Sequence, residues 1–303
     1  MPSLSEILKS KAESNQQRTE TRRAEKENLS ALREGALEQV TTNPQLYADY
    51  LTLQGNNIGC SAGNVAMTLF QLQAPTKIGT ADYWHQQGRF VNDADFHNGA
   101  QVFVPPKNPQ YKGYFVGEYY DVSQTSGKPI AEIQPLSEDG NRMDNAFAAL
   151  LDTSPVGFTE NTELEMPVRY NDREGVLEIN TNFSKPEVFA ALATEITYAR
   201  IHDRGRNRDY DRELFKLDAE SVGYMVCRRF GVESPLPDTK NVGTLYEGYG
   251  ADDRGKSLDR LRQTARNMGD TVERTIAPRQ QAQTNNRNNV RSGSNNRRQY
   301  AMR

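Results

Sequence analysis

A glutamate and a histidine seven residues apart, Glu195 and His202, are the residues whose types and spacing most favour chemistry. If their segment is a helix, Tyr198 lies between them at intervals of three and four, and all three side chains share one face. An acidic residue from the next segment, Asp218 or Glu220, could approach that face. Such a set of oxygen and nitrogen donors suits a weakly held divalent ion better than tightly bound zinc.

Two helices are expected to position these residues. The first opens with a capping box formed by Ser184 and Glu187, with Pro186 in the first turn. The second runs from Glu213 to Phe230 and stops at Gly231. Its core face is predicted to hold Leu214, Leu217, Val222, Met225 and Val226.

The rest of the chain is predicted to mix helices with short strands. Apolar residues from Leu29 to Val40 recur at helical spacing, and Asn43-Pro44 breaks that helix. Residues 1–28 read as a solvated helix or arm. Further helices are predicted at 45–54, 61–72, 141–152 and 257–276, and strands at 101–104, 114–122, 166–170 and 176–179.

The stretch from Tyr111 to Tyr120 is dense in aromatic residues, and lysines lie close to it in the sequence. Single-stranded bases could stack on such rings while basic side chains hold the phosphates. The alternative is a strand whose aromatic residues pack the sheet. The candidate nucleic-acid contacts in this region are Arg89, Lys107, Lys112, Tyr114 and Tyr119.

Charge is unevenly distributed along the chain. The formal net charge is −3, but residues 277–303 hold six arginines and no acid, which leaves −9 for residues 1–276. An acidic body does not attract a phosphate backbone, although it could bind a protein partner. The Asn/Gln/Arg/Ser-rich tail is expected to be disordered. Its arginines are further candidates for sequence-independent nucleic-acid contact, namely Arg287, Arg291, Arg297 and Arg298.

Several other classes of site and location find no support in the sequence. Cys60 and Cys227 are too far apart in sequence to suggest a clustered thiolate zinc site, and a disulfide framework is not expected. His85 is expected on a surface or half-buried helix, and His97 in a solvent-facing turn. Neither a nucleophile-elbow motif nor a phosphate-binding glycine loop occurs. Without an apolar segment long enough for a membrane span, and without a secretory pattern at the N-terminus, a cytoplasmic location is expected.

The segment LATEITYARIH, from Leu192 to His202, resembles the zinc helix L-x-H-E-I-A-H-A-x-x-H of ArdC-type antirestriction and LtrC-like proteins of mobile elements. Glu195 matches the glutamate, but the two histidine positions hold Thr194 and Tyr198. The segment 217–227 is similar to the family's E-A-E-S-V-A-Y-V-V-C, which supplies the acidic third ligand. The resemblance covers roughly residues 45–230 and also includes Tyr50-Leu51, Cys60–Asn64, Gln71, Trp84, Gly88-Arg89, Gly99 and Tyr120–Gly127.

The resemblance implies an N-terminal domain that binds single-stranded DNA and a C-terminal zincin-like metallopeptidase domain. In a zincin, two histidines four residues apart bind Zn²⁺, and the glutamate between them acts as general base on the metal-bound water. Threonine is a poor ligand, and tyrosine binds metal only as a phenolate, from a starting pKa of about 10. We therefore expect no zinc or other cofactor, and Glu195 to be a vestigial general base.

The volume of the missing metal is expected to be filled by Tyr198, with its hydroxyl bonded to Glu195, Asp218 or Glu220. His202 is the alternative, as a substitute ligand. The predicted fold is α+β: a small antiparallel sheet with helices, a zincin-like helical module and a basic tail. The predicted domains are a charged arm at 1–28, an ArdC-like domain at 29–135, a zincin-like domain at 136–276 and the tail at 277–303.

The predicted function is that of a catalytically inactive zincin-like protein of a phage or other mobile element. It would act by binding, with single-stranded DNA as the leading partner, in an antirestriction or DNA-transfer role. Two alternatives stay open at this stage. One is a metal-dependent hydrolase with an atypical Glu/His/Asp site, and the other is a structural or scaffolding protein.

Overall fold

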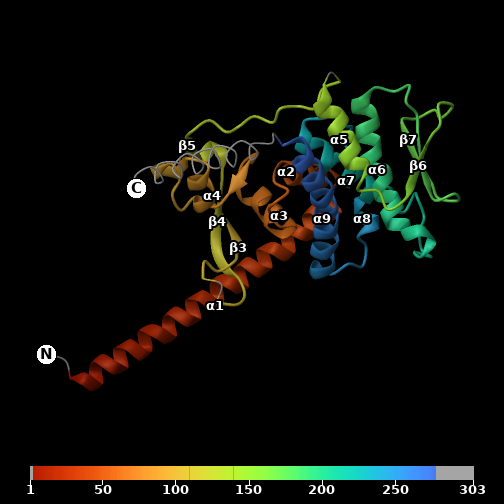
Figure 1. Cartoon of the computed structure of the whole chain (residues 1–303). Coiled ribbons are helices and arrows are strands. Elements are labelled where there is room, and N and C mark those ends of the chain that lie inside the picture. The colour runs from red at the N-terminus through yellow and green to blue at the C-terminus, as the bar shows by residue number, and fades with distance from the viewer. Residues whose placement is uncertain (1–2, 109, 139, 278–303) are drawn as a thin grey trace, which may run out of the picture.

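The computed structural model describes residues 3–108, 110–138 and 140–277. Over these residues the chain forms an α+β fold, as predicted, in which helices make up most of the body (Figure 1). The α-helices are α1 (Leu4–Thr42), α2 (Pro44–Asn56), α3 (Ala62–Gln71), α4 (Ala81–Gln86), α5 (Asn141–Leu151), α6 (Lys185–His202), α7 (Lys216–Phe230), α8 (Val242–Leu245) and α9 (Ala251–Ile276). Within the described ranges, no helix is both long and apolar enough to cross a membrane.

Helix α1 is a single helix with two different environments. Its first two dozen residues are almost entirely exposed, and they project from the body so that the N-terminus lies at the far tip (Figure 1). From Leu29 onward one face is buried, including Leu37 and Val40. The helix ends where Asn43 caps the next one by accepting hydrogen bonds from the backbone N–H groups of Gln45 and Leu46. The arm and the docked helix are therefore continuous, because nothing in the intervening sequence breaks helical structure.

Two small antiparallel sheets follow. In the first, the order is β1 (Ile78–Gly79), β4 (Phe115–Asp121), β3 (Ala100–Val104), and β3 pairs with β4 from Ala100 opposite Tyr119 to Val104 opposite Phe115. The second pairs β2 (Arg89–Val91) with β5 (Thr125–Gly127). Short 3-10 turns occur at Asp93–Asp95, Val122–Gln124 and Asp203–Gly205.

Side-chain amides of α3 complete the free edge of β3. The Asn64 amide donates to the carbonyl of Phe103 at 2.8 Å and accepts from its N–H at 3.2 Å. Gln71 does the same for Gln101, with both distances at 2.9 Å. Each amide thus imitates one residue of a neighbouring strand, so the edge is satisfied without another strand.

The C-terminal half adds a three-stranded sheet of order β6 (Gly157–Glu160), β8 (Val176–Ile179), β7 (Val168–Asn171). The hairpin of β7 and β8 is antiparallel, as predicted, whereas β6 pairs in parallel with β8 and was not foreseen. The four-residue strand β6 is exposed on both faces and shows no hydrophobic alternation, so the sequence carries no strand signal there.

Helix α9 holds the two halves together. It packs against α5 and α7 of the C-terminal half and against α1 and α3 of the N-terminal half. One hydrophobic cluster accordingly extends from Leu29 to Val272. The division at residue 135 stays a prediction, since the apolar core continues across it.

Candidate functional site

Helix α6 forms as its sequence predicts and carries Glu195 into the interior. The Ser184 hydroxyl accepts from the N–H of Glu187, and the Glu187 carboxylate accepts from the N–H of Ser184, which confirms the capping box. Glu195 lies two turns before the end of the helix and is only 5% exposed. A carboxylate at that depth is costly to bury unless it has partners.

The partners of Glu195 are a strand and an arginine. Its Oε2 accepts from the backbone N–H of Tyr170 in β7 at 2.7 Å and from Nη1 of Arg212 at 3.0 Å. Its Oε1 accepts from Nη2 of Arg212 at 2.5 Å. The two side chains therefore form a bidentate ion pair, which is the strongest geometry for an arginine and a carboxylate.

Tyr198 supports Arg212 from the other side. The guanidinium carbon of Arg212 lies 3.9 Å from the centre of the Tyr198 ring, so the cation stacks on the ring face. Burial opposes the charge of Arg212, but the hydrogen bonds and attraction of Glu195 outweigh it and raise the Arg212 pKa. Burial also raises the pKa of Tyr198, although the Arg212 cation works in the opposite direction. The expectation that Tyr198 would reach Glu195 with its hydroxyl gives way to a stacked arrangement with the guanidinium between them.

His202 belongs to a separate aromatic cluster. Its Nδ1 is 2.7 Å from the hydroxyl of Tyr170, and its ring centre is 4.6 Å from that of Tyr210. Tyr210 in turn stacks on Phe215 at 6.3 Å. These two contacts hold the His202 ring at the end of α6.

The two acids of α7 point in different directions. Residues two apart on a helix lie on nearly opposite faces, so only one of Asp218 and Glu220 can face α6. Glu220 lines the same groove as Glu195. Asp218 instead faces α9, with Arg260 at 4.0 Å, and burial raises its pKa to about 6 even though Arg260 lowers it.

Thr194 marks a close approach of α6 and α7. A Cβ built on Gly223 would lie 2.1 Å from the Thr194 hydroxyl oxygen, so only glycine fits at position 223. Leu214, which the helical period places in the core, is 52% exposed because α7 begins only at Lys216. The segment before α7 is a turn that carries Arg212, and Arg212 contacts Glu195 on α6.

A groove of about 670 Å³ runs over this part of the molecule, between α6, the start of β7 and the segment 233–238. Lys216 is its one basic lining residue. Its acidic lining residues are Glu187, Glu195, Glu220, Glu233 and Asp238. This acidic wall is unfavourable for a phosphate backbone.

The nucleic-acid candidates of the N-terminal half differ in accessibility. Tyr114 is 62% exposed, and Lys112 is exposed beside it. Lys107 is also exposed but forms an ion pair with Asp82 at 2.6 Å. Tyr119 is half-buried near Asn64, and burial raises its pKa.

Arg89 has a structural position. Its guanidinium donates to the Thr125 hydroxyl at 2.8 Å, and to the carbonyls of Lys128 at 2.7 Å and Thr125 at 2.5 Å. These bonds join β2 to β5, and they turn the donor groups of Arg89 toward the protein rather than toward a ligand. The tail candidates Arg287, Arg291, Arg297 and Arg298 lie outside the described residues.

No family model matches the chain, and no curated protein matches it. Among solved structures, the chain is similar to the antirestriction protein ArdC of plasmid R388 in its metal-free form, with a TM-score of 0.41 and 18% identity over 71% of this chain and 84% of that one. The Mn(II)-bound form gives a TM-score of 0.42 and 19% identity over 72% of this chain and 85% of that one. A likeness of this size identifies no residue's role here.

The expectation of no cofactor is corrected by the second of these structures, because a protein similar to this chain holds Mn(II). The residues around Glu195, as arranged, do not fit such an ion. Arg212 occupies both carboxylate oxygens of Glu195, and His202 is bonded to Tyr170. Within residues 3–277, apart from 109 and 139, no group of three or more His, Cys, Asp or Glu side chains could hold a metal.

Arg212 is the site residue that sequence reasoning missed. It is one of four arginines between the two helices, at positions 204, 206, 208 and 212, and aspartates 203, 209 and 211 lie among them, so the run resembles a solvated loop of balanced charge. A signal was nevertheless present, because a buried glutamate that lacks histidine neighbours needs a cation from elsewhere. A tyrosine three residues further along the helix also provides a flat surface for a guanidinium.

Proposed function

We propose that this protein binds single-stranded DNA through the β3–β4 hairpin, in an antirestriction or DNA-transfer role for a mobile element. The observation that carries the proposal is the group of exposed aromatic side chains at the hairpin. Tyr111, Tyr114 and Phe115 are 63%, 62% and 39% exposed, and lysines 107 and 112 lie beside them in the sequence. Rings that do not pack the core can stack on unpaired bases.

The rest of the surface makes the hairpin the favoured place. The groove over Glu195 is lined by five carboxylates and one lysine, so it would repel phosphates. In the same proposal the Glu195 centre is structural rather than catalytic. Three hydrogen bonds that its carboxylate already accepts support that assignment.

Fluorescence anisotropy of a labelled 20-nucleotide oligo(dT), measured with the full-length protein across a salt series, tests the proposal. Tyr114→Ala should weaken binding by about 10-fold, which corresponds to one lost base stack. The matched control is Phe158→Ala, since Phe158 is 60% exposed but lies on β6 in the C-terminal half.

The contribution of the tail is measured separately, because its arginines can bind nucleic acid without any hairpin contact. A full-length variant with Arg287, Arg291, Arg297 and Arg298 changed to Gln should keep the Tyr114 effect. Two results together would contradict the hairpin site: the tail variant no longer binds oligo(dT), and Tyr114→Ala does not weaken binding by the parent protein. Equal binding of double-stranded DNA would contradict the stacking argument.

A further inference from the structure

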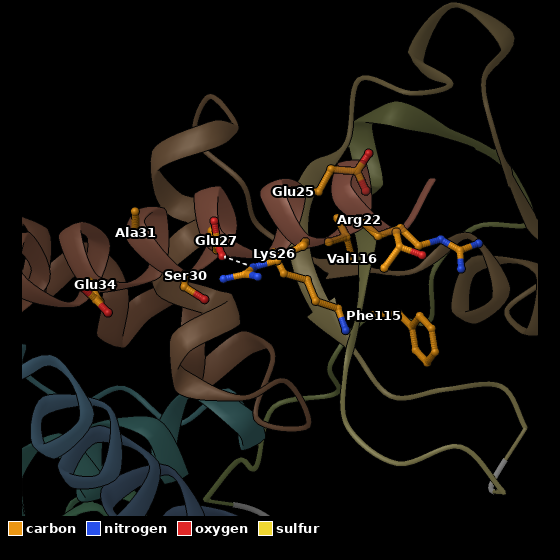
Figure 2. A pocket seen from close by; sticks show the side chains of 11 residues that line it. Arg22, Glu25, Lys26, Glu27, Ser30, Ala31, Glu34, Phe115 and Val116 are labelled. Atoms are coloured by element: carbon orange, nitrogen blue, oxygen red, sulfur yellow. Dashed lines mark hydrogen bonds and ion pairs between the residues drawn. The ribbon is translucent and has the colours of Figure 1, made fainter. Parts of the chain in front are cut away.

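Helix α1 passes directly beside the hairpin and encloses a second hollow with it. The groove between α1 and the start of β4 has a volume of about 820 Å³ (Figure 2). Its hairpin wall consists of Phe115 and Val116. Its helical wall extends from Thr19 to Glu34, across the end of the exposed arm and the start of the docked part of α1.

The helical wall carries two cations, of which Lys26 extends toward the hairpin. Arg22 and Lys26 are four residues apart, so they share a face of α1. The Lys26 ammonium nitrogen lies 5.3 Å from the centre of the Phe115 ring. In Figure 2 the Lys26 side chain extends toward Phe115, and the Glu25 side chain points away from it. Among the described residues, neither Arg22 nor Lys26 belongs to an ion pair.

The wall as a whole is charge-balanced, because its acidic residues Glu25, Glu27 and Glu34 equal its basic residues Arg22, Arg23 and Lys26 in number. Arg23 is bound to Glu27 at 2.8 Å, so that pair adds no net charge. Glu34 lies three turns along the helix from Arg22, about 18 Å away at the rise of an α-helix. Among the described residues, Arg22 and Lys26 are therefore the basic residues of this wall outside any ion pair, and Lys26 lies opposite Phe115.

The same strand also lines a second, largely apolar hollow. This hollow has a volume of about 790 Å³ and shares Phe115 and Val116 with the groove beside α1. Its aromatic and proline lining residues are Phe96, Pro105, Pro106, Tyr111, Phe115 and Tyr120. The start of β4 thus borders one hollow that holds Arg22 and Lys26, which belong to no ion pair among the described residues, and one that is largely apolar. These are the two environments that the backbone and the bases of a single strand require.

We infer that α1 is the second wall of the nucleic-acid site, with Arg22 and Lys26 binding phosphates of a strand whose bases stack on Phe115 and enter the apolar hollow behind it. This inference rests on the proposed function and assigns a role to the arm. The arm as a whole has nearly balanced charge, so a contact by general attraction is not expected from it. Only the turns that face the hairpin are suited to the task.

The test is the double variant Arg22→Ala/Lys26→Ala in the full-length protein. Each phosphate contact to a single strand contributes about 0.7 to the slope of log K against log salt, so the slope should fall by about 1.4. Affinity for oligo(dT) at 0.1 M salt should fall by about 10-fold. Lys11→Ala/Arg18→Ala is the matched control, because it removes the same charge from α1 outside the groove. It should change affinity less than about two-fold and leave the slope unaltered.

The outcomes separate the inference from the proposed function. Wild-type protein that binds oligo(dT) while Arg22→Ala/Lys26→Ala keeps the wild-type slope overturns the role of α1 alone. An equal loss in the control pair also overturns it, because the arm would then act only by general attraction. No binding by the wild-type protein overturns both proposals. Parallel titrations with oligo(rU) show whether the site distinguishes DNA from RNA, and circular dichroism verifies that each variant keeps its helix.

Discussion

Arg212 lies between Glu195 and Tyr198, with both terminal nitrogens on the carboxylate and its guanidinium plane on the ring. The carboxylate is 7% exposed and the arginine side chain 34%, so the pair joins a buried anion to a cation that reaches it from the surface. The ion pair also fixes β7, because Glu195 accepts from the Tyr170 N–H. A turn, a helix and a strand are thus held at one point.

Loss of the arginine should destabilise the fold. Arg212→Ala leaves Glu195 buried with only the Tyr170 N–H as partner, and should lower the free energy of unfolding by about 2–3 kcal/mol. Glu195→Gln/Arg212→Ala should lose less than the sum of Glu195→Gln and Arg212→Ala, with a coupling energy of about 1–2 kcal/mol. Urea denaturation followed by circular dichroism measures both.

The control for this prediction is Arg208→Ala, which removes an exposed arginine of the same turn. Its effect should stay within about 0.5 kcal/mol. If Arg212→Ala is no more destabilising than Arg208→Ala, or if the effects of the two single changes simply add, the ion pair does not stabilise the folded state.

Gly223 should tolerate no side chain while Thr194 is opposite. Gly223→Ala places a Cβ 2.1 Å from the Thr194 hydroxyl oxygen and should cost about 1–3 kcal/mol. In Thr194→Ala/Gly223→Ala the nearest remaining Thr194 atoms are 3.3 Å away, so most of that loss should be recovered. Gly35→Ala is the control, because it lies within α1 with nothing within 4 Å and should stabilise by about 0.5–1 kcal/mol. If the double variant does not regain stability, the loss in Gly223→Ala does not come from the contact with Thr194.

Asp218 should make stability depend on pH. Burial raises its pKa to about 6 in the folded protein, against about 3.9 in an unfolded chain. Between these values the folded state keeps a proton that the unfolded state has lost, so stability falls as the pH rises from about 4 to 6. Asp218→Asn should remove this decrease. Its free energy of unfolding relative to the parent protein should be higher at pH 7 than at pH 4, by at most about 3 kcal/mol.

Urea denaturation at pH 4.5 and pH 7 measures that difference. Asp209→Asn serves as the control, since Asp209 is an exposed carboxylate in the turn before α7. An Asp218→Asn protein with the same change in stability between the two pH values as the parent would rule out a protonated, buried Asp218.

Local signals in the sequence predicted most of the helices and strands. The capping box at Ser184, the stop at Gly231 and the Asn43-Pro44 break each act within a few residues, so they hold in the folded protein. The alternation that predicted the β7–β8 hairpin is local in the same way. Strand β6 was missed because its pairing with β8, across 19 residues, is set by the chain path rather than by its own residues.

The candidate site was less predictable from the sequence. Spacing placed Glu195, Tyr198 and His202 on one helix, but could not say which partners come from outside it. The helical period alone shows that only one of Asp218 and Glu220 can face α6, but it does not show which of the two does so. Tyr119 is half-buried because it meets Asn64 of α3, whereas Tyr114 stays exposed, and the aromatic pattern of the segment does not reveal this difference.

By itself the sequence determined the helical frame, the acidic body with its basic tail, and a Glu195 without histidines at the neighbouring ligand positions. These follow from residue types and from contacts within a few turns. Only the tertiary structure decided that Arg212 supplies the missing positive charge and that α1 stands beside the hairpin. Both depend on segments that meet through the packing of other elements, and the free energy of such contacts is a property of the assembled core rather than of either segment.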